Sequence, residues 1–226
     1  MREYVEKVLG EMPDEMDGTA TTPAASHLFQ IRGDAIALEN KKKDFLHTTV
    51  AKLLFLCKRG RPDIQTAVAF LCTRVREPTS DDESKLTRVI RYLRGTKDLT
   101  LQLRANNLNI VKLWVDGAFA VHEGMKSHTG GVMLLGKGSA YSASRKQKIN
   151  TKSSTEAELV AIDDVLPQAL WTKYFLEGQG YGTNTIMYED NQSTMRLAQN
   201  GKLSSGQRTR HINIRYFFHH RPDRAQ

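Results

Sequence analysis

The hydrophobic pattern of this 226-residue chain changes its period near residue 98. Upstream of that point, apolar residues recur every three or four positions, as on one face of an amphipathic helix. Three such stretches follow one another, at 50–57, 64–75 and 86–93. Downstream, short apolar runs typical of strands lie at 109–116, 130–136 and 185–190. Because helices and strands repeat with different periods, the pattern predicts a small helical unit followed by a mixed α/β domain.

The order of elements in the α/β domain follows from the turn signals between its apolar runs. A tight turn with sequence GKG joins the second strand to a possible third strand at 138–144. A long helix is expected from Ser153 to Glu177, with a kink at Pro167. The fourth strand then precedes two further helices, of which the last starts near Thr209. Three strands, a helix, a fourth strand and more helices are typical of a mixed sheet with flanking helices.

The charge and cysteine content narrow the class of protein. The formal net charge is +8, which favours a polyanionic partner. No apolar run approaches the roughly 18 residues that span a membrane, and the N-terminal stretch 1–12 lacks the apolar core of a signal peptide. Cys57 and Cys72 are too few for a disulfide framework and lie in helical apolar patterns, which indicates reduced, buried thiols. These features predict an intracellular protein without a membrane partner.

Two aspartates stand at the ends of predicted strands. Asp116 ends KLWVD and precedes Gly117, and Asp190 ends TIMYED and precedes Asn191. A strand end at the crevice of a sheet is a rigid place for a chemical group. Each aspartate also has a structural interpretation, because Asp116 could start a turn and Asp190 could cap the next helix. Taken one by one, neither aspartate decides between these interpretations.

The predicted long helix places two glutamates, Glu156 and Glu158, on different faces. Ser153 and Glu156 have the spacing of a capping box, which gives Glu156 a local structural role. Glu158 lies about 200° away from Glu156 around the helix and shares its face with Ala161 and Val165. A carboxylate on a buried face is costly unless it is paired, protonated or bound to a metal. Glu158 is therefore predicted to point toward the sheet, either into a site or into a local hydrogen bond.

Three converging carboxylates would repel one another, and hard divalent cations relieve that repulsion. Oxygen ligands alone suit Mg²⁺ or Mn²⁺. If Asp116, Glu158 and Asp190 converge, two ions about 3.5–4 Å apart could clamp a phosphodiester and activate water. In a basic chain, this arrangement leads to a nuclease hypothesis, which spacing alone does not prove.

Long strings of the sequence carry a resemblance. They are WVDGAFAVHEGMKSHTGGVM, SASRKQKINTKSSTEAELVAI and YEDNQSTMRLAQNGKLSSGQRTRHINIRYFF. These strings resemble the ribonuclease H domain of copia-type retrotransposon polyproteins. Upstream, DGTATTPAASHLF, KLLFLCKRGRPDIQTAVAFLCTRV and KLTRVIRYLRGTKDLTL resemble the segment that joins the reverse transcriptase to that domain. The resemblance implies a mainly helical connection segment at 1–104 and a ribonuclease H-like domain at 105–226.

The resemblance implies a five-stranded mixed sheet with flanking helices and two-metal hydrolysis of RNA in RNA–DNA hybrids. Asp116 in VDG, Glu158 in AEL and Asp190 in EDN match the family's catalytic carboxylates, which hold two Mg²⁺ or Mn²⁺ ions. The implied partners are an RNA–DNA hybrid and the reverse transcriptase part of the same polyprotein. The implied location is a cytoplasmic virus-like particle or the nucleus.

The resemblance also implies that four further residues contact nucleic acid. Ser127 and Thr129, in KSHTGG, are expected in a loop beside the substrate backbone. Arg210 and His211, in RTRHI, are expected to contact phosphate or to brace the last helix.

The chain departs from the family pattern at its C-terminus. The family continues with a fifth strand and a last helix that carries a fourth catalytic aspartate, and Asp223 is the only acid here after Asp190. We therefore expect an incomplete domain with weak or absent activity of its own. Two function classes stay open, a metal-dependent endoribonuclease and an inactive remnant that at most binds nucleic acid. A third class, a helical interaction module at 44–95, has only the amphipathic pattern in its favour.

Overall fold

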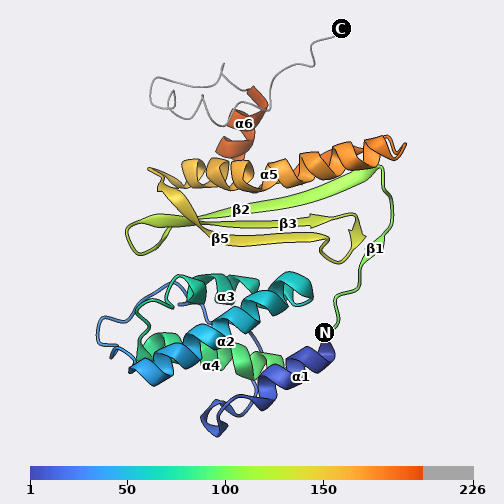
Figure 1. Ribbon diagram of the computed structural model, residues 1–226. Coiled ribbons are helices and arrows are strands. Elements are labelled where there is room, and N and C mark those ends of the chain that lie inside the picture. Colours follow the sequence, from blue (N-terminus) through green and yellow to red (C-terminus); the bar gives the residue numbers. More distant parts are fainter. Residues whose placement is uncertain (201–226) are drawn as a thin grey trace. The chain divides into compact units, whose positions relative to one another are not determined.

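The computed structural model describes residues 1–200, with side chains through Arg196. The chain divides into two compact units, one consisting mainly of Met1–Leu103 and the other beginning at Arg104 (Figure 1). Within the described residues, no helix is both long and apolar enough to cross a membrane.

The first unit is helical, as the 3.6-residue pattern predicts. Its helices are α1 (Arg2–Gly10), α2 (Asn40–Arg59), α3 (Gln65–Cys72) and α4 (Ser80–Gly95), with 3₁₀ turns at Asp14–Met16 and Pro62–Ile64. The apolar faces of these helices meet in one core, whose fully buried side chains include Leu53, Phe70, Leu86 and Ile90. Helix α3 ends at Cys72, before the end of its apolar pattern, because the chain turns at 73–77 ahead of Pro78.

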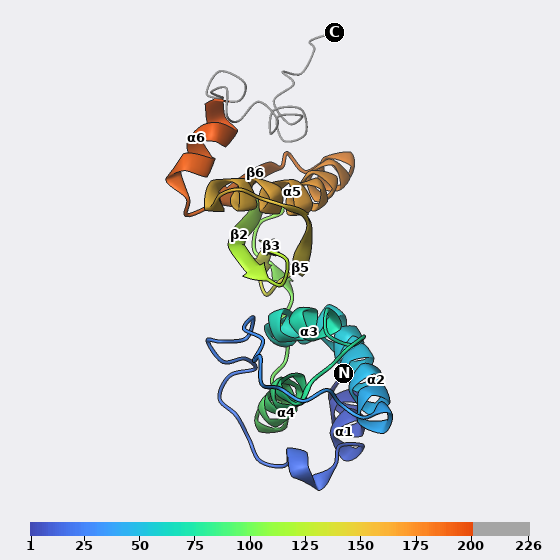
Figure 2. The same cartoon turned by 90° about the vertical axis from the view of Figure 1, so that its left-hand side faces the viewer.

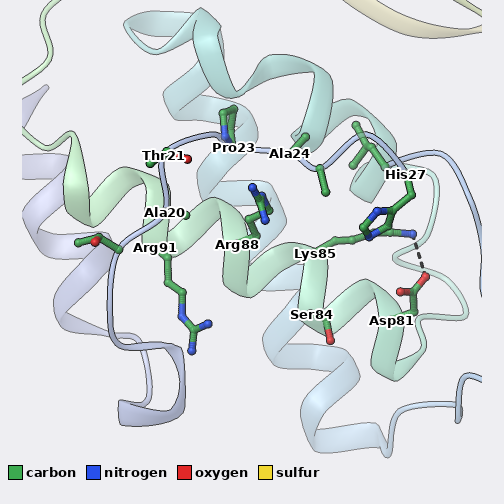
Figure 3. A pocket seen from close by; sticks show the side chains of 13 residues that line it. Ala20, Thr21, Pro23, Ala24, His27, Asp81, Ser84, Lys85, Arg88 and Arg91 are labelled. Carbon is green, nitrogen blue, oxygen red and sulfur yellow. Dashed lines mark hydrogen bonds and ion pairs between the residues drawn. The ribbon is translucent and has the colours of Figure 1, made fainter.

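A cavity of about 530 Å³ lies between helix α4 and the loop around residues 19–28 (Figure 3). Three cations of α4 line this cavity, and each donates a hydrogen bond to the segment that crosses the helix. Lys85 donates to Gln30 O, Arg88 to Thr22 Oγ1, and Arg91 to Asp17 O. Lys85 Nζ also lies 2.8 Å from Asp81 Oδ2, so this buried charge is paired. These cations fasten the loop to α4, and they do not converge on a common point in the cavity (Figure 3).

The second unit is a mixed α/β structure. A four-stranded sheet has the order β5-β3-β2-β6, from β2 (Ile110–His122), β3 (Lys126–Leu134), β5 (Tyr141–Asn150) and β6 (Asn184–Tyr188). Strand β2 is antiparallel to β3 and parallel to β6, so the sheet is mixed. Strands β1 (Arg104–Ala105) and β4 (Gly136–Lys137) form a separate short ladder. Helix α5 (Ser154–Gly178) lies along the sheet, and α6 (Gln192–Asn200) follows β6 (Figures 1 and 2).

The predicted third strand lies later in the sequence than the apolar pattern indicates. The chain turns at Gly138, whose φ is +77°, and Ser139 Oγ donates to Tyr141 O. Strand β5 therefore starts at Tyr141 and extends through the polar residues that follow. Most residues of β5 are polar and only two of its side chains are buried, so the apolar pattern alone underestimates its length.

One face of the sheet packs against α5, and the opposite face exposes aromatic rings. Side chains of β2 alternate between buried Val111, Leu113 and Val115 and exposed Lys112, Trp114 and Asp116. The buried set packs against Ala161, Val165 and Ala169 of α5. On the other face, the rings of Trp114 and Tyr188 stack with centroids 4.6 Å apart. The alternation thus gives the sheet one apolar face, which packs against α5, and one exposed face.

The β2–β3 hairpin contains two buried histidines. His122 Nε2 and His128 Nδ1 lie 2.8 Å apart. Burial, together with His122, lowers the pKa of His128 from 6.5 to about 4. Between these values the unfolded chain binds a proton at His128 and the folded chain does not, so acid favours unfolding.

We expect the free energy of unfolding to fall as the pH is lowered from about 6.5 toward about 4. Urea unfolding across this window, in wild type and in His128→Gln, measures the contribution, and the variant should lose less stability. An equal loss in both proteins would contradict the assignment to His128.

Candidate metal centre

Asp116 and Asp190 occupy equivalent positions on neighbouring parallel strands. Trp114 of β2 pairs with Tyr188 of β6. Asp116 lies two residues after Trp114, and Asp190 lies two residues after Tyr188. Strand β2 continues to His122, so Asp116 does not start a turn. Asp190 lies beyond the end of β6, where β2 loses its parallel neighbour. Register alone therefore places the two carboxylates side by side.

Neither aspartate serves the structural role that the sequence left open for it. The cap of α6 is Asn191, whose Oδ1 accepts a hydrogen bond from Thr194 N at 3.1 Å. Asp190 therefore does not cap α6, and its side chain is exposed. The structural interpretations of Asp116 and Asp190 are wrong, because the chain uses other residues for these roles.

The start of α5 places Glu158 and Glu156 as their spacing predicts. Ser153 caps the helix by accepting a hydrogen bond from Glu156 N at 3.2 Å, and the Glu156 carboxylate accepts from Lys152 N at 2.7 Å. Glu156 is therefore used locally. Glu158 is 6% exposed and lies among the residues that α5 buries. The prediction that Glu158 faces inward is confirmed.

Gly117 permits α5 to approach β2 at this point. A Cβ atom on Gly117 would lie 2.8 Å from the carbonyl carbon and oxygen of Ala157, and 2.8 Å from Glu158 Oε2. Any side chain here would push the first turn of α5 away from the strand. The glycine thus holds the helix carboxylate close to the strand that carries Asp116.

The three carboxylates converge. One oxygen from each of Asp116, Glu158 and Asp190 lies within 4.8 Å of the other two. Glu158 Oε2 is buried and has no hydrogen-bond partner within the described residues. An unpartnered buried carboxylate oxygen requires a proton or a cation. An all-oxygen donor set with an unpartnered buried member fits Mg²⁺ or Mn²⁺.

The electrostatics of Glu158 follow from its surroundings. Burial, followed by the negative charges of Glu189, Asp116 and Asp190, raises the pKa of Glu158 from 4.5 to about 8. The backbone amide of Gly117 acts in the opposite direction. Without a cation, Glu158 is thus protonated at neutral pH, and a bound cation would displace that proton.

Sequence reasoning missed a fourth acid at this site, Glu189. Its Oε1 accepts a hydrogen bond from Asn191 N at 3.1 Å, and its Oε2 is buried without a partner in the described part of the chain. Burial raises the pKa of Glu189 as well. The available signal was strand alternation, because Glu189 follows Met187 by two residues and Met187 packs against the core.

Ser127 and Thr129 require a correction. Both were expected in a loop beside a substrate, but they lie in β3 and are fully buried. The Ser127 hydroxyl bonds to Ala120 N and Thr151 Oγ1. Thr129 Oγ1 donates to Asp164 Oδ2 at 2.8 Å. These hydroxyls link β3 to its neighbours, because the KSHTGG stretch pairs with β2.

Arg210 and His211 lie outside the described residues. Their predicted contact with phosphate stays a prediction.

Comparison with known proteins shows which proteins this chain is similar to. No family model and no solved structure matches it. The chain is 28% identical over 219 residues to the retrovirus-related Pol polyprotein from transposon TNT 1-94 of Nicotiana tabacum, a match that covers 94% of this chain and 16% of the relative. It is 31% identical over 161 residues to the retrovirus-related Pol polyprotein from transposon RE2 of Arabidopsis thaliana, with coverage of 70% and 11%. It is 30% identical to the retrovirus-related Pol polyprotein from transposon RE1 of the same plant, a match that again covers 70% of this chain and 11% of the relative. Homologues of this chain are thus retrotransposon Pol polyproteins, and the chain corresponds to one segment of them.

Proposed function

We propose that the second unit is a ribonuclease H-like domain that hydrolyses the RNA strand of RNA–DNA hybrids with divalent metal. The convergence of Asp116, Glu158 and Asp190 within 4.8 Å carries this proposal. Support also comes from the mixed sheet covered by a helix and from relatives that are retrotransposon Pol polyproteins. The net charge of +8 suits a nucleic-acid partner.

Each carboxylate has a distinct role in the proposed reaction. Asp116 and Asp190, exposed on adjacent strand positions, would bind the cations from the solvent side. Glu158, held by α5 against Gly117, would complete the ligand set from the buried side. When bound, Mg²⁺ or Mn²⁺ supplies activation of water and neutralisation of charge at the phosphate. The rigid backbones of β2 and α5 keep the carboxylates in place before substrate arrives.

The first unit and the location belong to the same proposal. We propose that residues 1–104 form the connection to a reverse transcriptase and that the ribonuclease H-like domain occupies 105–226. The partners would be the hybrid and the reverse transcriptase part of the polyprotein, in a cytoplasmic particle or in the nucleus.

Cleavage of an end-labelled RNA–DNA hybrid tests the activity. With Mg²⁺ or Mn²⁺, wild type should cut the RNA strand weakly, and Asp116→Asn should abolish that cleavage, because even outer-shell changes at metal sites cost about 10–100-fold. Asp98→Asn, which changes an exposed aspartate of the helical unit, serves as the control. Single-stranded RNA and double-stranded RNA of the same sequence should remain intact.

Other results would have definite meanings. Hybrid binding without cleavage would support the inactive remnant. Cleavage that persists in Asp116→Asn would rule out this site as its source.

A further inference from the structure

The space beside the three carboxylates is bounded by three elements. Met187 of β6 packs against the core under α5, so Glu189, two positions later, leaves the strand on the side of α5. The start of α6 is joined to the first turn of α5, because Thr194 Oγ1 donates to Thr155 O at 3.4 Å. The Glu189 side chain therefore lies between the end of β6 and the turns that begin α5 and α6. This is the region to which α5 contributes Glu158.

Glu189 is oriented by its own contacts. Its Oε1 accepts from Asn191 N, which leaves Oε2 as the second acceptor of the same carboxylate. Oε2 is shielded from solvent and has no hydrogen-bond partner in the described part of the chain. Glu158 shows the same condition, with 6% exposure and an unpartnered Oε2. Two buried, unpartnered carboxylate oxygens beside Asp116 and Asp190 call for positive charge.

We propose that Glu189 is a fourth acidic residue of the metal centre, which contributes its Oε2 to divalent cation binding beside Glu158. The proposal rests on the function proposed above and adds a residue that the family motif does not assign. Glu189 lies outside the trio whose oxygens are all within 4.8 Å of one another. Its contribution is therefore a supporting position on the buried side, next to Glu158, and not one of the three shared ligands.

The chemistry of the pair supports this role. Glu158 and Glu189 each present a buried Oε2 that has no hydrogen-bond partner within the described residues. Glutamates 158 and 189 thus form the shielded half of an acidic site, and Asp116 and Asp190 form its exposed half. A fourth negative charge beside the three ligands strengthens the attraction for a hard cation, even when it is not itself one of the shared ligands.

Mn²⁺ binding by the full chain, measured by isothermal titration calorimetry without nucleic acid, tests the proposal. Glu189→Gln keeps an oxygen that accepts from Asn191 N and replaces the charged Oε2 by a neutral amide nitrogen. We expect the Kd for Mn²⁺ to rise about tenfold or more in this variant. Glu177→Gln, the same change near the far end of α5, should leave the Kd unchanged. Glu189→Asp keeps the charge with a shorter reach and should fall between wild type and Glu189→Gln.

The outcomes separate this inference from the proposed function. If Asp116→Asn removes Mn²⁺ binding and both Glu189 variants bind as wild type does, the role of Glu189 is overturned and the three-carboxylate site stands. If the wild-type protein binds no Mn²⁺, both proposals fall. Circular dichroism of each variant verifies folding, and Glu189→Asp carries the test if Glu189→Gln does not fold.

Discussion

Glu158→Gln should make the metal-free protein more stable and abolish its binding of divalent metal. The folded chain retains a proton on Glu158 up to about pH 8, whereas the unfolded chain releases it near pH 4.5. Wild-type stability therefore falls as pH rises between these values, since the folded state binds more protons. Glutamine is neutral at every pH and avoids this loss, so we expect a gain on the order of a few kcal/mol at pH 8 and above, since one pKa unit corresponds to about 1.4 kcal/mol.

Divalent metal should reverse that order. A cation that binds only the folded state stabilises wild type by mass action, and Glu158→Gln loses this effect together with hybrid cleavage. Thermal unfolding near pH 8, with and without Mg²⁺, measures both halves of the prediction. Glu156→Gln is the matched control, because Glu156 is on the same helix, lies outside the carboxylate trio and accepts the local bond from Lys152 N. If the metal-free Glu158→Gln protein is less stable than wild type, Glu158 has a structural role instead.

A methyl group at position 117 should damage both the fold and the site. The Cβ of Gly117→Ala would lie 2.8 Å from backbone atoms of Ala157, which cannot move without shifting α5. Overpacking of this kind costs about 1–3 kcal/mol, and we expect the upper end because the obstacle is backbone. The same Cβ would displace Glu158 Oε2, so metal binding should weaken in parallel.

Gly130→Ala provides the comparison for this prediction. Gly130 pairs with Asp116 across the ladder, but its Cβ would meet Asp116 O at an ordinary 3.5 Å. Urea unfolding should show near-wild-type stability for Gly130→Ala and a clear loss for Gly117→Ala. Equal stability of the two variants would show that α5 adjusts to a methyl group at 117 without cost.

Most of the helices and the three candidate carboxylates, though not the convergence of these carboxylates, could be predicted from local patterns. Apolar periodicity gave α2 and α4, and the position of Glu158 relative to Glu156 on α5 gave the inward direction of its carboxylate. Strand β5 was harder to predict, because most of its residues are polar and its apolar pattern is too short to mark its full length. Ser127 and Thr129 were expected in a loop because the family resemblance implies a loop for the KSHTGG stretch. In this chain the stretch pairs with β2, and both buried hydroxyls make internal hydrogen bonds.

The sequence by itself determined which residue types could form the site: two aspartates after apolar strands and a glutamate on the buried face of a helix. Those properties depend on the period of each element, and they can be read within one segment. Only the tertiary structure decided that these segments meet, through the parallel pairing of β2 with β6 and the close approach of α5 at Gly117. It also showed Glu189 beside them, because burial and the lack of a hydrogen-bond partner depend on residues that are distant in sequence.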